Sequence, residues 1–168
     1  LHVWAPTIVR KPGDITYYMF YTGVQLDTIP RQPPLSPIFT EIQRIGVATS
    51  FDLNTWSQDP TPVFHNKKTS WAFQDSSTNI VDAGGAQFYS DTWQLRDPFV
   101  MQDPDSAGRW LLYYVTIDSM LNRYVVGVAR TQGTDLRAWE DVWPIRRTST
   151  AFMNAGRDES PHALHRNG

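Results

Sequence analysis

Short apolar and aromatic runs alternate with turn residues along the whole chain, and few windows place apolar residues at helical spacing. Runs rich in Val, Ile, Tyr, Phe and Trp, bounded by Gly, Pro, Asp and Asn, are typical of β-strands. We therefore predict an all-β protein. Eight strands are expected, over residues 3–10, 16–22, 44–50, 56–64, 98–102, 110–116, 124–130 and 139–146. A ninth is expected to begin near Pro161.

Segments of the first half of the chain recur in the same order in the second half. The matched pairs are 4–9 with 96–100, 17–22 with 110–115, 45–48 with 126–129, and 52–56 with 135–139. A third copy begins at Glu159. Repeats of four antiparallel strands joined by short turns are the plan of a β-propeller blade. A sandwich with two chance-similar halves is the alternative, but the shared order of all the matches favours the propeller.

The repeats divide the chain into about two blades and the start of a third. We expect a first blade over 1–64, an inter-blade loop over 65–95, a second blade over 96–147 and the next blade from 159 to 168. Within the first blade, 25–43 carries four prolines and is expected to be a stiff surface excursion. The inter-blade loop carries several aromatic residues, most of which are expected to seal the interface between blades.

Composition excludes several classes of function. A net charge of −2 without basic clusters argues against a nucleic-acid partner. The longest apolar stretch, 110–115, is too short to span a bilayer, and no signal peptide opens the chain. The absence of cysteine excludes a disulfide scaffold, a thiol nucleophile and Cys-ligated zinc. It leaves the compartment open, with secretion or the periplasm favoured for the complete parent.

Each repeat begins with a tripeptide that ends in proline. These blade starts are Trp4-Ala5-Pro6, Arg96-Asp97-Pro98 and Glu159-Ser160-Pro161. In a propeller the first strand of each blade lines the central channel, so the blade starts should gather at one mouth of that channel. Two carboxylates there, Asp97 and Glu159, suit glycosidic-bond chemistry, in which one stays ionised and another delivers a proton. Glu159 stands one position earlier than Asp97 relative to its proline, so their convergence requires the chain to bend before the strand.

The ordered set of blade starts, with residues 50–56 between them, resembles the five-bladed propeller glycoside hydrolases. These include the arabinanases and xylosidases of family 43 and the β-fructosidases of family 32. The resemblance implies that Asp97 holds the acid's pKa or stabilises the transition state, and that Glu159 is the general acid. It also implies a third carboxylate as base or nucleophile, and here the corresponding position is Ala5. We therefore expect a partial glycosidase with little turnover of its own.

Other functions remain open alongside the glycosidase. A non-catalytic carbohydrate-binding or assembly module keeps the blades without the chemistry. A glycoside phosphorylase needs a basic phosphate pocket, for which Arg96, Arg146 and Arg147 are the candidates. No cofactor is expected. An oligosaccharide or polysaccharide is the expected partner, and exposed blade edges predict self-association, for example as a symmetric dimer.

Several other residues are weighed as candidates for sugar or metal binding. Trp4 and Trp93 are candidate sugar-stacking platforms, with core packing as the alternative, and Arg96 is a candidate substrate-binding residue. Residues 103–108 faintly resemble a calcium loop, but their composition favours an ordinary turn. His162 and His165 follow Glu159, and surface or packing roles are favoured for them over metal binding. No metal site is expected. Because Leu1 is not a methionine, we expect sequence upstream of it.

Overall fold

The computed structural model describes most of the chain. The described residues are 2–29, 38–65, 69, 71–72, 79–81, 87–89, 94–118, 123–145 and 160–165. They contain strands and turns and no helix. Accordingly, none of the described residues belongs to a helix long and apolar enough to cross a membrane.

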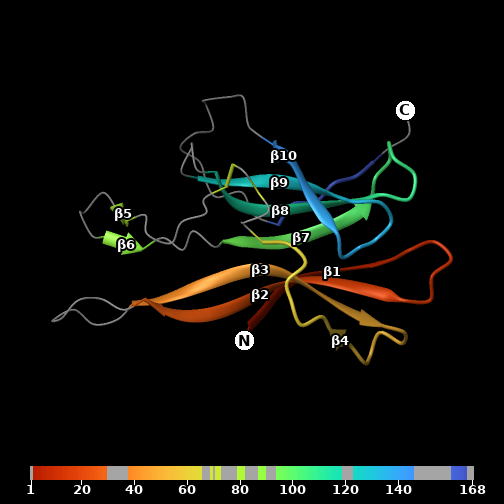
Figure 1. Ribbon diagram of the computed structural model, residues 1–168, viewed down its shortest axis with the longest axis horizontal. Coiled ribbons are helices and arrows are strands. Elements are labelled where there is room, and N and C mark those ends of the chain that lie inside the picture. Colours follow the sequence, from red (N-terminus) through yellow and green to blue (C-terminus); the bar gives the residue numbers. More distant parts are fainter. Residues whose placement is uncertain are drawn as a thin grey trace.

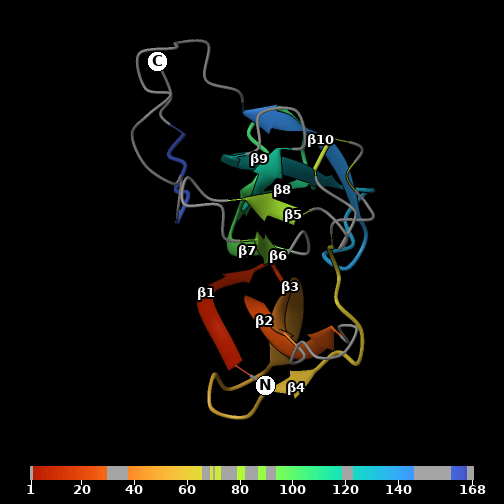
Figure 2. The same ribbon diagram turned by 90° about the vertical axis from the view of Figure 1, so that its left-hand side faces the viewer.

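The strands form two sheets of four antiparallel strands each, stacked one above the other (Figure 1). The first blade holds β1 (His2–Arg10), β2 (Tyr17–Ile29), β3 (Ile38–Ser50) and β4 (Ser57–Gln58). The second holds β7 (Leu95–Gln102), β8 (Trp110–Asp118), β9 (Arg123–Thr131) and β10 (Trp139–Ile145). In both, strand order follows chain order. This confirms the predicted fold class, all-β with partial propeller blades, and Figure 2 shows the two sheets from the side.

The strand boundaries differ from expectation in three places. The excursion predicted over 25–43 is wrong at both ends, because β2 and β3 continue their ladder as far as the pair Ile29–Ile38. Residues 30–37, which carry its four prolines, lie outside the described residues. The fourth strand predicted over 56–64 is reduced to Ser57–Gln58 and a single bridge from Phe64 to Ile45. Pro60 and Pro62 lie between these two contacts and have no N–H to donate to a ladder.

The third difference concerns the chain after the second blade. Residues 160–165 form no strand, although a ninth was predicted to begin near Pro161. The loop predicted over 65–95 contains a short hairpin of β5 (Asn79–Val81) and β6 (Gln87–Tyr89). The predicted boundaries of the blades and of the loop between them remain a prediction.

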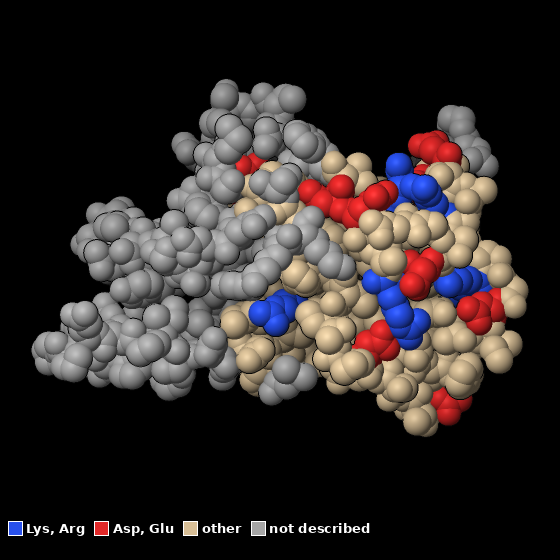
Figure 3. Space-filling view, in the orientation of Figure 1, with Lys and Arg blue, Asp and Glu red and all other residues tan. Residues whose placement is uncertain are grey.

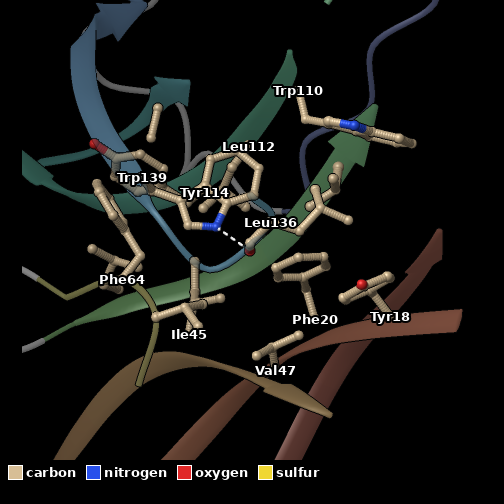
Figure 4. Close-up of a cluster of buried hydrophobic side chains, with 14 of the residues drawn as sticks. Tyr18, Phe20, Ile45, Val47, Phe64, Trp110, Leu112, Tyr114, Leu136 and Trp139 are labelled. Carbon is tan, nitrogen blue, oxygen red and sulfur yellow. Dashed lines mark hydrogen bonds between the residues drawn. The ribbon is translucent and has the colours of Figure 1, made fainter. Parts of the chain in front are cut away.

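The core lies between the two blades. Side chains of β2 and β3 meet the side chains of β8 and of the turn before β10, and most of them are fully buried (Figure 4). Phe20 packs edge-on against Trp139, with ring centroids 5.7 Å apart. Burial of several large side chains in this one layer stabilises the packing of blade on blade.

The matched turns between the third and fourth strands share one internal bond. The indole N–H of Trp56 donates to the carbonyl of Leu53 at 3.1 Å, and that of Trp139 donates to Leu136 at 2.8 Å. Asp52 closes the first turn by accepting the backbone N–H of Thr55 at 2.8 Å. Trp139 is buried between the blades as predicted, whereas Trp56 is only half-buried.

A tyrosine faces a glycine across the ladder in each blade. Tyr21 pairs with Gly46 and Tyr114 pairs with Gly127. A methyl group added at Gly46 would lie 2.6 Å from the Tyr21 ring, and one at Gly127 would lie 2.4 Å from the Tyr114 ring. The rings occupy the space that any other residue would need, so these two positions require glycine.

One aromatic residue of the predicted inter-blade loop, Trp71, belongs to the buried core. The buried Trp71 ring stacks on Tyr114 with centroids 6.3 Å apart, and its N–H donates to Oδ2 of Asp141 at 2.8 Å. The Tyr114 hydroxyl donates to Oδ1 of the same carboxylate at 2.7 Å. Burial raises the pKa of Asp141 above its ordinary value of 3.8, and the two hydrogen bonds oppose that rise. The predicted aromatics Phe73 and Trp93 lie outside the described residues.

Charged side chains of both signs are mixed over the face shown in Figure 3. One ion pair joins the blades, because Nε of Arg137 in the second blade lies 2.6 Å from Oδ2 of Asp59 in the first. Both side chains are partly exposed, and pairs of this kind add on the order of 0–1 kcal/mol. The apolar layer therefore contributes more to the contact between blades than the surface charges do.

Gly127→Ala is expected to lower the free energy of unfolding by about 1–3 kcal/mol, because the added methyl forces the Tyr114 ring to move within a packed core. Urea denaturation followed by fluorescence measures the loss. Gly23→Ala is the matched control, since its methyl meets nothing closer than 3.7 Å. Equal stability of the two variants would contradict the assigned role of Gly127.

Asp141→Asn is expected to change how stability depends on pH. A raised pKa in the folded state means that ionising Asp141 costs more there than in the unfolded chain, so its contribution to stability falls as pH rises above about 3.8. Asparagine does not ionise. The unfolding free energy of the variant relative to wild type should therefore increase from pH 4 to pH 7, and parallel pH curves would contradict the burial of this charge.

Candidate functional site

Each blade start is held in an uncommon backbone conformation. Ala5, Asp97 and Ser160 have φ angles of 45°, 54° and 48°, and each directly precedes a proline. Positive φ is unfavourable for residues with a Cβ, and a following proline restricts it further. In β1 and β7 the ladder shifts register at these positions, between Trp4 and Thr7 and between Arg96 and Phe99. These bulges supply the bend that convergence of the blade starts requires.

The three blade starts converge on one hollow of about 300 Å³, which we call the hub hollow. Its lining consists of three consecutive tripeptides, one from each repeat: Ala5, Pro6, Thr7, Asp97, Pro98, Phe99, Ser160, Pro161 and His162. Segments that are far apart in the sequence therefore present equivalent positions to one space. Asp97 is the acidic residue in this lining.

The Asp97 side chain is fixed by neighbours on both sides. Its backbone N–H donates to Oγ1 of Thr22 at 2.9 Å, which ties it to β2 of the preceding blade. Its Oδ2 accepts the backbone N–H of Ser160 at 3.1 Å, which ties it to the following blade start. The carboxylate therefore bridges the second repeat and the third, and it is largely enclosed, with a side-chain exposure of 12%.

Arg96 is oriented by a cluster that the sequence did not reveal. Its Nε lies 3.8 Å from Oδ2 of Asp97, and its NH1 donates to Oε1 of Gln94 at 2.9 Å. The guanidinium stacks over the Tyr124 ring at 4.4 Å. The Tyr124 hydroxyl also donates to Oε1 of Gln94, and Oγ1 of Thr116 donates to the carbonyl of Gln94 at 2.6 Å. Gln94 precedes Arg96 by two residues, whereas Tyr124 is distant in the sequence and only folding brings its ring to Arg96.

Of the other predicted residues, some lie near the hub hollow and some lie outside the described residues. Trp4 precedes Ala5 on β1 and is 40% exposed, but it does not line the hub hollow. Glu159 and Trp93 lie outside the described residues, so their placement stays a prediction. His162, for which a surface or packing role was favoured, lines the hollow, and its ring lies 5.0 Å from that of Phe99.

The described residues hold no group of three or more His, Cys, Asp or Glu arranged for a metal ion. Residues 103–108 form the turn between β7 and β8, as favoured from their composition. The backbone N–H of Asp103 donates to the carbonyl of Arg109 at 2.9 Å, and Gly108 supplies a φ of 77°. Asp103 instead pairs with Arg130, with 2.8 Å between Oδ2 and Nε.

The sequence matches no protein-family model and no curated protein. Solved structures do share its fold. A glycosyl hydrolase from Bacteroides ovatus is 20% identical and superposes with a TM-score of 0.50, covering 92% of this chain and 35% of that chain. A structure from work on the GH130 family of mannoside phosphorylases, which contains glycoside hydrolases that target β-1,2-mannosidic linkages in Candida mannan, is 18% identical with a TM-score of 0.51. It covers 92% of this chain and 35% of that chain.

This chain therefore has the fold of part of these larger proteins and spans about a third of their length. The likeness is one of architecture, namely a propeller shared with glycoside hydrolases. What the hub hollow binds must be argued from its own residues.

Ala5→Gly is expected to stabilise the fold by about 1 kcal/mol, because glycine adopts a φ of 45° without the Cβ clash that alanine suffers. Thermal unfolding measures the gain as a rise in Tm. Ala107→Gly is the matched control, since Ala107 is exposed in a turn and does not have a positive φ. A loss of stability in both variants would contradict the strained conformation at the blade start.

Proposed function

We propose that the hub hollow binds a glycan and is part of the active centre of a glycoside-hydrolase-like protein. The observation that carries the proposal is the convergence of the blade starts on one hollow, with Asp97 fixed in its lining. A carboxylate that is largely enclosed and held by the backbone N–H of Ser160 is suited to stabilise an oxocarbenium-like transition state. Fold likeness to glycosyl hydrolases supports the same class of substrate.

Each blade start has a proposed role. Asp97 stabilises positive charge on the sugar. Arg96, predicted as a substrate-binding residue, is buried and does not line the hollow, so its proposed role is to orient the Asp97 carboxylate. Glu159, next to Ser160, is the proposed general acid. Ala5 occupies the position equivalent to Asp97 and offers only a methyl group. Without a base or nucleophile at that position, the chain alone should bind glycans and hydrolyse them little.

The sugar belongs to one of the classes that such propellers act on. Family 43-like and family 32-like activities correspond to arabinosides, xylosides and β-fructosides, and the GH130 relative adds β-1,2-mannosides. The hub hollow is small, at about 300 Å³, and so fits one or two sugar units rather than a long chain segment. Short oligosaccharides of each class are therefore the appropriate probes.

NMR titration of the ¹⁵N-labelled chain with β-1,2-mannobiose, arabinotriose, xylotriose and a fructo-oligosaccharide tests the proposal. One sugar class should shift the amide signals of Thr7, Asp97, Phe99 and His162. Asp97→Asn should weaken that binding about tenfold, since hydrogen bonds to a charged group contribute on the order of 1.5–3 kcal/mol. Asparagine tolerates positive φ and still accepts from Ser160, so the backbone is preserved.

Asp105→Asn, in the exposed turn after β7, is the control and should bind as wild type does. No shift at the hub with any of the sugars would refute the proposed site. Turnover that Glu159→Gln abolishes would refute the expected inactivity while supporting the assigned acid. Turnover that depends on added phosphate would instead favour a phosphorylase.

A further inference from the structure

A second hollow lies on the face of the first blade that points away from the second blade. Residues alternate across a strand, so Phe20 faces the second blade while Tyr21 faces the opposite side, which we call the back face. The back-face hollow measures about 220 Å³. It is lined by Tyr21, Gly23, Gln25, Ile42, Arg44, Gly46, Gln58, Asp59, Pro60, Thr61 and Pro62.

The strand registers identify the equivalent place in the second blade. The pair Tyr21–Gly46 corresponds to Tyr114–Gly127, since each tyrosine covers its glycine in the same way. Gln58 pairs with Ala48 on the outer strand, just as Asp141 pairs with Ala129. Gln58 also hydrogen-bonds the Tyr21 hydroxyl, as Asp141 does that of Tyr114.

In the second blade this place is filled by a tryptophan. Trp71 stacks on Tyr114 and donates its N–H to Asp141, and the neighbouring Ala72 makes an isolated bridge with Asp118. Trp71 is 6% exposed there. The back-face hollow has the matching tyrosine, glycine and outer-strand acceptor, and no tryptophan of the described residues lines it.

A neighbouring leucine is also covered in the second blade and exposed in the first. Leu136 in the second blade is fully buried, whereas its counterpart Leu53 in the first blade is 46% exposed. Exposure of an apolar side chain whose counterpart is buried is typical of a surface that another element covers.

We propose that the back-face hollow is a docking site for a tryptophan side chain, presented by the extended segment of another propeller blade that packs on this face. The indole would stack on Tyr21 and donate its N–H to the side-chain oxygen of Gln58. Leu53 would then be buried as Leu136 is. This interface is separate from the hub hollow and does not depend on its function.

A peptide with the sequence of residues 65–72 is the probe, because this segment carries the tryptophan that fills the equivalent place. Added to the ¹⁵N-labelled full chain, it should shift the amide signals of Tyr21, Gly23, Gly46 and Gln58. The same peptide with Trp71→Ala should bind at least fivefold more weakly. Concentration-dependent shifts at these residues without peptide would also support the site, with a second copy supplying the blade.

Gly23→Val should abolish these shifts, since the added side chain enters the hollow while its Cβ keeps contacts of 3.7 Å. Gln58→Leu removes the oxygen that would accept the indole N–H and should weaken binding. This second variant keeps the test informative if Gly23→Val does not fold. Ile15→Ser, also exposed but outside the lining, should bind as wild type does. Absence of shifts at these residues, or equal binding of the two peptides, would overturn the proposal.

Discussion

The positive φ of the residue before each blade-start proline is the constraint on which the hub depends. At Ala5, Asp97 and Ser160 this conformation costs each residue about 1–2 kcal/mol. In β1 and β7 it coincides with a bulge in the ladder, and all three residues line the hub hollow. A regular strand there would point Asp97 elsewhere, and the blade starts would share no common space.

Packing between the blades holds those starts in place. Phe20, Trp139 and Leu136 form one apolar layer, and Trp71 closes its edge by joining Tyr114 and Asp141. The same arrangement is half present on the back face of the first blade, where Tyr21 and Gln58 are in place without an indole. One blade-to-blade contact thus explains both the closed interface within the chain and the open surface beside it.

Much of this architecture is predictable from local patterns. Short apolar runs locate the strands, and matched short segments locate the repeats. Each of these signals can be recognised in a stretch of a few residues. The proline tripeptides also predict that Pro6, Pro98 and Pro161 lie at equivalent places. The extension of β2 to Ile29 and of β3 back to Ile38 is not predictable in this way, because the pairing of these strand ends depends on tertiary context.

The finer features of the site depend on distant contacts. Positive φ at Ala5 opposes the preference of both alanine and a residue before proline, so no local rule predicts it. Tyr124 reaches Arg96 from another strand, and Trp71 and Asp141, which share a hydrogen bond, are 70 positions apart in the sequence. His162 is exposed and packs on Phe99, which agrees with the surface or packing role predicted for it, and the sequence alone does not show that it also lines the hub hollow. Nuclear Overhauser contacts between the Phe99 and His162 rings test the central claim most directly. They should be observed if the second and third blade starts meet at the hub, and their absence in a chain that retains the β8–β9 cross-strand contacts would contradict it.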